Sequence, residues 1–178
     1  MAYTVQELSD MEDIRTLKYR YFRGIDTADM AVLEGLFTDD ITVNYRGGTY
    51  RVAFSGKAQM MEFLASSFHS GGLAMHMGHM PEITLTGADS AEGVWSLQDV
   101  FINLELGTNH FGTAIYRDVY RRENGCWKIA KTEYDRVMEA LVPIDPGLKV
   151  TAHLLAQKGL QPEQRADISH LIEWDTVE

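Results

Sequence analysis

The chain has 178 residues, of which 45% are hydrophobic and 24% are charged, and its formal net charge at pH 7 is −10. A chain of this length and apolar content can bury a single substantial core, so neither a repeat array nor a disordered chain is expected. Its 16 basic residues are outnumbered by 26 acidic residues and interleaved with them. Because phosphate groups are bound by clustered Lys and Arg, these proportions argue against nucleic acid and against an anionic membrane surface as partners.

The N-terminal sequence Met1–Glu7 lacks the basic stretch followed by an apolar stretch that marks a secretory signal, and nowhere do 18 consecutive apolar residues occur. A cytoplasmic protein that is not exported is therefore expected. Cys126 is the single cysteine, which excludes an intrachain disulfide and a cysteine-rich metal site and agrees with a reducing compartment.

One long amphipathic helix is predicted near the start of the chain. Apolar residues recur at three- and four-residue steps over 8–25, which predicts a helix that ends near Asp26, with Ser9 or Asp10 as its N-cap. Tyr21 lies on the apolar stripe of this helix, where a tyrosine is usually a core residue. Asp26, taken alone, is a capping or turn carboxylate, since aspartate favours such positions.

Three further elements follow in the first half of the chain. A short second helix is expected over 29–37, closed by a turn at 38–40. The β-rich runs 41–45 and 50–54 are separated by Arg-Gly-Gly-Thr, which predicts a hairpin. A third helix is expected over 56–68.

The second half is mostly strand. Glycine-containing turns at 87–89, 107–109 and 123–125 separate long β-rich runs, and such turns join antiparallel neighbours. Helices followed by long antiparallel strands predict an α+β fold, in which a curved antiparallel sheet packs on the N-terminal helices around a cavity. We expect 1–141 to form this domain. Residues 142–178 hold three of the four prolines and are expected to be a cavity lid or an arm that crosses to another subunit. The expected strands cover about 74–86, 90–105, 110–122 and 126–136.

Asp99 is placed on an apolar strand face, because two-residue alternation groups it with Trp95 and Phe101. A carboxylate on such a face must be paired or have its pKa raised. Asp99 is therefore either a structural hydrogen-bond partner of a Tyr, Arg or His, or a residue of a functional site. Trp95 and Phe101, on the same face, are predicted substrate contacts.

Two histidines, His76 and His79, lie three residues apart in an expected strand. Residues three apart in a strand face opposite sides, so the two rings do not converge, and no metal site is predicted. His76 is either a hydrogen-bonded core residue or a catalytic base.

The sequence holds no Walker loop, no glycine-rich dinucleotide turn after an early strand, no Gly-x-Ser-x-Gly and no HExxH. Phosphoryl transfer, hydride transfer and serine hydrolysis therefore lose support. No cofactor is expected.

Four segments in a fixed order, 13–26, 36–40, His76 and 116–129, together resemble the SnoaL-like branch of the nuclear transport factor 2-like (NTF2-like) superfamily. The resemblance covers about residues 5–140. It is strongest to scytalone dehydratase, the bile acid 7α-dehydratases and hexachlorocyclohexane dehydrochlorinase. The resemblance implies a cone-shaped α+β fold and a cofactor-free lyase.

Residue by residue, the resemblance implies a catalytic Asp–His dyad formed by Asp26 and His76. Tyr21 matches a catalytic tyrosine of the bile acid dehydratases, and Asp99 matches their second aspartate. Arg136 corresponds, with a shift of a few residues, to a cationic group late in the last strand of those enzymes, and is on this resemblance a predicted substrate contact.

Three positions depart from the scytalone enzyme. Ile25 stands where that enzyme has a tyrosine, and Ala114 and Tyr116 stand where it has a serine and an asparagine. Scytalone itself is therefore not the expected substrate, and Tyr116 is a predicted substrate contact.

The function implied is a dehydratase acting on a small, largely apolar cyclic substrate such as a steroid or an aromatic compound. His76, oriented by Asp26, is the expected base, and Tyr21 or a neutral Asp99 is the expected acid. An isomerase on the same dyad is a near alternative. A non-catalytic ligand-binding protein or oxygenase subunit of the same fold is the other, since fold does not fix function.

The outer face of the predicted sheet is too apolar to remain exposed to water, which predicts a homodimer or a homotrimer. The apolar residues expected there are Val94, Val100, Ile102 and Leu104.

Overall fold

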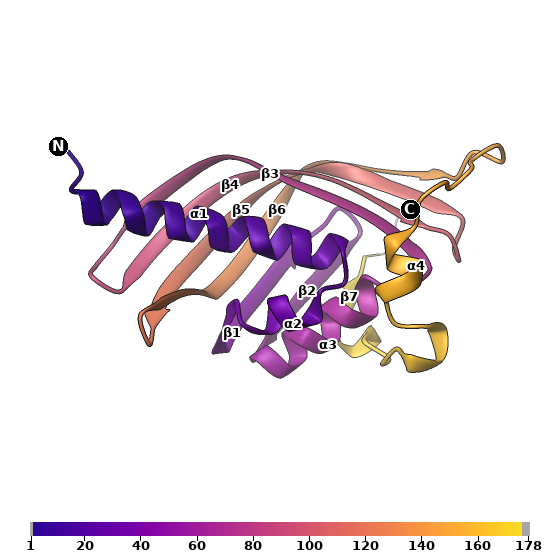
Figure 1. The fold of residues 1–178 in the computed structure, drawn as a ribbon. Helices are drawn as coiled ribbons and strands as arrows, with labels where there is room; N and C mark the ends of the chain where they lie inside the picture. Colours follow the sequence, from indigo (N-terminus) through magenta and orange to yellow (C-terminus); the bar gives the residue numbers. More distant parts are fainter. Residues whose placement is uncertain (1, 176–178) are drawn as a thin grey trace.

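A computed structural model describes residues 2–175 and shows a long helix lying along the concave face of a strongly curved sheet (Figure 1). In this part of the chain the sheet has seven strands in the order β3-β4-β5-β6-β1-β2-β7. The predicted α+β class is confirmed. The elements are α1 (Val5–Asp26), α2 (Met30–Glu34), β1 (Phe37–Arg46), β2 (Tyr50–Ser55), α3 (Lys57–Ser67), β3 (Gly72–Leu85), β4 (Ser90–Asn103), β5 (Thr108–Glu123), β6 (Cys126–Pro143), α4 (Leu154–Lys158) and β7 (Ile172–Trp174), with single 3-10 turns at Pro162–Gln164 and Ser169–Leu171.

Helix α1 begins earlier than predicted. Thr4 is its N-cap, and Thr4 and Glu7 form a capping box in which each side chain accepts from the other residue's backbone N–H. The prediction of Ser9 or Asp10 as the cap is wrong, because the capping box lies one turn before them. The Asp10 carboxylate is instead buried and lies 2.7 Å from the Arg122 guanidinium. The predicted end at Asp26 is confirmed.

Helix α2 is shorter than predicted, since Asp29 caps it and only Met30–Glu34 are helical. The predicted turn at 38–40 is wrong, because these residues lie in β1. Phe37 and Ile41 are fully buried, and Phe37 pairs with Ile129 of β6. Strand pairing and burial therefore outweigh the local turn propensity of Thr-Asp-Asp.

The predicted hairpin of β1 and β2, the helix α3 and the four long antiparallel strands β3 to β6 are all confirmed. Strand β6 runs beyond position 136 to Pro143. The sheet as a whole is mixed rather than antiparallel, because β1 pairs with β6 in parallel. That parallel pair brings Tyr45 of β1 directly beside Tyr134 of β6, and both side chains line the cavity described below.

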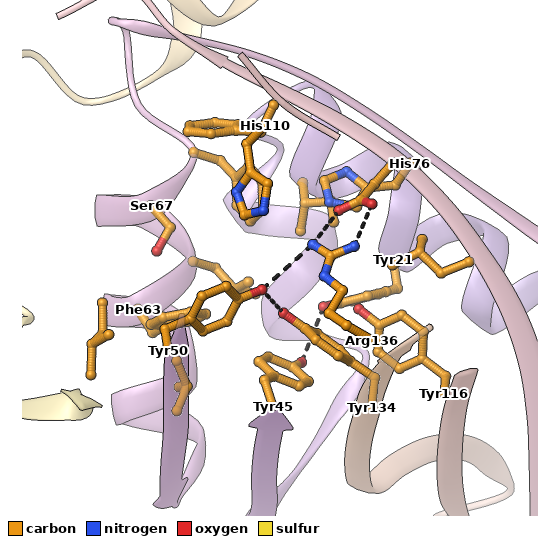
Figure 2. Close-up of a pocket in the computed structure, with 18 of the residues that line it drawn as sticks. Tyr21, Tyr45, Tyr50, Phe63, Ser67, His76, His110, Tyr116, Tyr134 and Arg136 are labelled. Atoms are coloured by element: carbon orange, nitrogen blue, oxygen red, sulfur yellow. Dashed lines mark hydrogen bonds and ion pairs between the residues drawn. The ribbon is translucent and has the colours of Figure 1, made fainter. Parts of the chain in front are cut away.

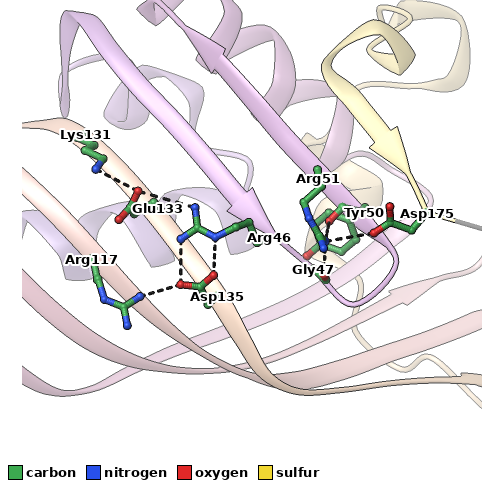
Figure 3. A network of polar contacts seen from close by, with 9 residues as sticks. All are labelled: Arg46, Gly47, Tyr50, Arg51, Arg117, Lys131, Glu133, Asp135 and Asp175. Carbon is green, nitrogen blue, oxygen red and sulfur yellow. Dashed lines mark hydrogen bonds and ion pairs between the residues drawn. The ribbon is translucent and has the colours of Figure 1, made fainter.

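Ion pairs cover the outer side of the β1–β6 junction (Figure 3). Arg46 donates to the Asp135 carboxylate, its partner in the register, and Arg117 of β5 donates to the same carboxylate at 2.8 Å. Such half-exposed pairs contribute little individually, but this group connects three neighbouring strands.

The segment after β6 returns to the domain rather than leaving it. The His153 Nε2 atom lies 2.9 Å from the Gly72 carbonyl oxygen at the start of β3. Arg165 donates twice to the Glu105 carboxylate, at 2.9 and 3.0 Å. Strand β7 then adds to the sheet by pairing antiparallel with β2. No helix in the described residues is long and apolar enough to cross a bilayer.

Candidate active site

A cavity of about 220 Å³ lies between the concave face of the sheet and the helices α1 and α3 (Figure 2). Its wall is mostly aromatic, and five tyrosines contribute to it. Its polar groups are few, as in most small-molecule sites. The lining residues are Tyr21, Ile25, Tyr45, Tyr50, Val52, Phe63, Leu64, Ser67, Phe68, His76, Leu97, Asp99, Phe101, His110, Tyr116, Tyr134, Arg136, Ile172 and Trp174.

The structure brings Asp26 and His76 together. The Nδ1 atom of His76 lies 2.6 Å from Asp26 Oδ1, and the backbone N–H of His76 donates to Asp26 Oδ2 at 2.9 Å. That N–H is free to do so because β3 is an edge strand of the sheet. Asp26 is the last residue of α1, so the end of the helix is attached to the strand at this point. Since a carboxylate accepts from Nδ1, Nε2 is the nitrogen left for the cavity.

Aromatic side chains hold the imidazole ring of His76 on two sides. The Phe22 ring is stacked on it with a centroid distance of 6.3 Å, and the Phe68 ring meets it edge-on at 5.3 Å. Gly78, two residues along the same face of β3, leaves the space that Phe22 fills, because a Cβ there would lie 2.3 Å from the Phe22 ring. The ring of His76 is therefore fixed in position as well as in tautomer.

Tyr21 lies at the cavity wall, and its hydroxyl oxygen is 3.2 Å from that of Tyr45. Burial raises the pKa of Tyr21 to about 12. Burial also raises the pKa values of Tyr45, Tyr116 and Tyr134 well above their usual range. These hydroxyls are therefore neutral at pH 7 and can donate hydrogen bonds into the cavity.

Asp99 is paired with Arg136, which donates to its two carboxylate oxygens at 2.5 and 2.8 Å. Both side chains are more than nine-tenths buried. Burial alone would lower the pKa of Arg136, but its hydrogen bonds to Asp99 outweigh this and raise it. Because both Asp99 oxygens accept from Arg136, this geometry argues against the predicted role of a neutral Asp99 as proton donor. The alternative of a structural hydrogen bond is realised with arginine as the partner.

Phe101 and Tyr116 line the cavity, as predicted for substrate contacts, but Trp95 does not. Trp95 is fully buried under α1, where its Nε1 donates to the Tyr120 hydroxyl at 2.9 Å. Its prediction as a substrate contact is wrong, because alternation identifies the face of a strand but not the stretch of that face which a helix covers.

The sequence reasoning missed His110 and Glu139. His110 lines the cavity, and its Nε2 atom lies 2.9 Å from Glu139 Oε1. Alternation along β5 places His110 on the same face as Tyr116 and could have found it. Glu139 lies in the part of β6 that was not expected to be strand.

The described residues contain no group of three or more His, Cys, Asp or Glu side chains that could hold a metal ion. His79 is exposed, whereas His76 lines the cavity, so the two rings do face opposite sides of β3.

A family model described as the SnoaL-like domain matches residues 6–133. The chain belongs to the SnoaL-like family. One solved structure of similar fold is a hexachlorocyclohexane dehydrochlorinase from Novosphingobium barchaimii, with 17% sequence identity and a TM-score of 0.69 over 82% of this chain and 97% of that one. A second is a candidate scytalone dehydratase from Novosphingobium aromaticivorans, with 16% identity and a TM-score of 0.69 over 81% of this chain and 97% of that one. A third is an NTF2-like protein of unknown function from Pseudomonas putida, with 18% identity and a TM-score of 0.59 over 72% of this chain and 87% of that one. These likenesses show that the chain shares its fold with these proteins.

The SnoaL-like match includes Asp26 and His76 but ends at Glu133. Tyr134, Arg136 and Glu139 follow that point, and so does the C-terminal segment that adds Ile172 and Trp174 to the cavity wall. In this SnoaL-like protein the dyad therefore lies inside the shared family region, while much of the polar end of the cavity lies outside it.

Proposed function

We propose that this SnoaL-like protein is a cofactor-independent lyase that removes water from a small, largely apolar cyclic substrate such as a steroid or an aromatic compound. The observation that carries the proposal is the His76 ring in the wall of an aromatic cavity, with its Nδ1 2.6 Å from the carboxylate of Asp26, which does not itself line the cavity. An imidazole held by a carboxylate is a suitable general base near neutral pH.

In the proposed reaction, His76 Nε2 takes a proton from a carbon next to an activating carbonyl or aromatic group of the substrate. The electron pair of that C–H bond forms the new double bond, the C–O bond breaks, and the leaving hydroxyl takes a proton from Tyr21 to depart as water. Proton return from the imidazolium to the tyrosinate, through water, restores both residues. Asp26 stabilises the imidazolium, and each acid–base group contributes roughly 10²–10⁴-fold.

Two further observations support an elimination. The similar structures include proteins named as a dehydrochlorinase and a candidate dehydratase, and both names describe the loss of a small molecule from a substrate. Tyr21, with a pKa of about 12, holds its proton at pH 7 and is available as the acid. Tyr116 at the cavity wall continues to argue against scytalone as the substrate.

A purely ligand-binding role is less well supported. A binding module of this fold would be expected to lack the dyad or to fill its cavity with side chains, whereas this cavity is open and is lined by His76, the histidine of the dyad. An isomerase shares the proton abstraction and differs in the fate of the carbanion. Product analysis separates the two, because a dehydratase product has lost one water and an isomerase product has the mass of its substrate.

The test begins with native mass spectrometry of the freshly purified protein, to identify any retained small molecule. A panel of hydroxylated steroids and aromatic compounds is then incubated with the wild type and with His76→Ala. The expected result is a dehydrated product from the wild type only. Equal turnover by the two proteins would remove His76 from the mechanism and overturn the proposal.

We also propose that residues 142–175 close the cavity mouth and that the outer sheet face joins copies of this chain. Ile172 and Trp174 line the cavity. On the outer face, Val94 of β4 and Val137 and Met138 of β6 are exposed. Exposed apolar residues gathered on a sheet face are typical of subunit interfaces.

Ending the chain after Asp145 keeps β6 intact and tests the closure of the cavity mouth, while the assembly of the full chain tests the interface on the outer sheet face. We expect weaker binding of a neutral apolar fluorescent probe such as N-phenyl-1-naphthylamine to the cavity, because the Ile172 and Trp174 side of its wall is removed. Trp174→Ala is the milder companion variant and should weaken binding in the same direction. Sedimentation velocity should show a dimer or trimer for the full chain. Unchanged probe affinity in the shortened chain would dismiss the lid, and unchanged assembly would dismiss an arm that crosses to another subunit. A full chain that sediments as a monomer would dismiss the interface.

A further inference from the structure

Arg136 lies between two carboxylates, those of Asp99 and Glu139, at the polar end of the cavity. One edge of its guanidinium, Nη1 and Nη2, donates to Asp99. The other edge faces Glu139, whose Oε1 is 2.8 Å from Nε, and the Tyr50 hydroxyl, which accepts from Nη2 at 3.5 Å. A guanidinium has two edges that can grip a carboxylate with paired N–H groups. Asp99 occupies the first, while on the second Nε lies against Glu139 Oε1 without a hydrogen bond and Nη2 meets Tyr50.

A β-bulge in β6 brings Glu139 to this place. Residues 136 and 139 of a regular strand would face opposite sides of the sheet. In β6 the register shifts between the pairs Ala114–Arg136 and Thr113–Met138, so Val137 is an extra residue. Val137 and Met138 are both exposed, 68% and 48%, on the outer side, while Arg136 and Glu139 are both inside. The bulge therefore builds the second carboxylate contact.

Gly112 of β5 leaves room for this arrangement. A Cβ at position 112 would lie 3.3 Å from Arg136 Nη1 and 2.3 Å from the Met138 carbonyl oxygen. Any side chain here would obstruct both the bulge and the guanidinium. Three local features, the bulge, the glycine and the two acids, thus hold Arg136 against protein carboxylates.

The charge balance of this group is negative. Glu139 Oε2 accepts from the backbone N–H of Gly48 at 2.7 Å, and Oε1 lies beside His110 and Arg136. Counted by formal charge, with histidine taken as neutral, Asp99 and Glu139 against Arg136 leave one negative charge in excess. A ligand carboxylate entering the cavity would lose its hydration, and the edge of Arg136 left to it already lies against the Glu139 carboxylate, which would repel it.

We propose that the cavity takes neutral oxygenated ring compounds, such as phenols, ring alcohols and ring ketones, and rejects carboxylates, with the hydroxyls of Tyr50 and Tyr134 receiving the ligand oxygen. These two hydroxyls are hydrogen-bonded to each other and lie next to Arg136. Buried neutral hydroxyls both donate and accept, which suits a hydroxyl or carbonyl oxygen. The inference names the substrate class of the proposed function and rests on that function only for the location of the substrate.

The test compares two probes of equal ring size, 2-naphthol and 2-naphthoate, by isothermal titration calorimetry at pH 7. Naphthol is expected to bind the wild type at least about tenfold more tightly, a difference of about 1.4 kcal/mol. Equal affinities, a preference for naphthoate, or no binding of naphthol would each overturn the inference.

Glu139→Gln supplies the second arm of the test, since it keeps the shape of the side chain and removes its charge. The preference for naphthol should fall by about fivefold or more, mainly through tighter binding of naphthoate. Glu133→Gln is the matched control, because Glu133 is on the same strand but pairs with Lys131 away from the cavity. An unchanged preference in Glu139→Gln would contradict the charge argument. Because these titrations measure binding and not turnover, they can overturn the preference for neutral ligands while the lyase proposal stands. A failed turnover assay would likewise leave the binding preference standing.

Discussion

Replacing His76 with alanine is expected to slow turnover by about 10²–10⁴-fold, and Asp26→Asn is expected to fall in the same range. The alanine removes the proposed base. The asparagine still accepts from the backbone N–H of His76, but it can present an amide N–H to the ring in place of a carboxylate oxygen. It then favours the tautomer with the proton on Nε2, where the base must be unprotonated.

Two measurements separate this positioning role of Asp26 from a merely structural one. The ¹⁵N chemical shifts of the His76 ring should show the proton moving from Nδ1 to Nε2 in Asp26→Asn, and thermal unfolding should remain close to the wild type. His79→Ala and Asp29→Asn are the controls. His79 is exposed, and asparagine caps a helix as well as aspartate does. Full activity in Asp26→Asn would show that the carboxylate is not needed.

The positions of Asp26 and His76 show what the sequence could predict. Their spacing in the chain carries no geometric information, so the dyad rested on resemblance to a family. The structure adds the reason the two meet, which is that β3 is an edge strand whose free N–H at His76 is reached by the end of α1. Edge position follows from the whole sheet order and cannot be read from a local pattern.

Asp99 and Trp95 show where alternation succeeds and where it stops. It placed both on the buried face of β4 correctly. It could not show that α1 covers Trp95 while Asp99 remains at the cavity, since that depends on where the helix crosses the strand. The partner of Asp99 was also out of reach, because Arg136 lies on β6, two strands away from β4 in the sheet order, and no local pattern marks a contact across an intervening strand.

The parallel pairing of β1 with β6 escaped prediction for a related reason. Hairpin turns in the sequence identify antiparallel neighbours, but nothing local marks a pair of strands with four other strands between them in the chain. That pair places Tyr45 beside Tyr134, with their rings stacked at 4.5 Å. Part of the cavity wall therefore depends on long-range topology.

Replacing Lys18 with methionine is expected to lower the free energy of unfolding by about 3–5 kcal/mol. The Lys18 ammonium is 2.7 Å from Asp118 Oδ2, and neither side chain is exposed at all. The ammonium also lies 3.7 Å from the centre of the Tyr116 ring. Burial lowers the pKa of Lys18, and the Asp118 carboxylate opposes this effect. Removing the cation leaves Asp118 charged in the core with the Tyr120 hydroxyl as its hydrogen-bond donor.

Urea unfolding of the single and double variants measures the free energy of unfolding and shows whether its loss comes from the unpaired Asp118 carboxylate. If it comes from the unpaired carboxylate, Lys18→Met with Asp118→Leu should recover a large part of the stability, since an apolar pair can replace a buried ion pair. Lys131→Met is the control, because its ammonium is half-exposed and pairs with Glu133 at 3.0 Å, so it should cost less than about 1 kcal/mol. A loss of stability in Lys18→Met as small as that in the control would mean that water reaches Asp118 in the folded protein.

Lys18 lies one turn before Tyr21 and under Tyr116, so the single variant should also weaken binding at the cavity wall, which the naphthol titration would detect.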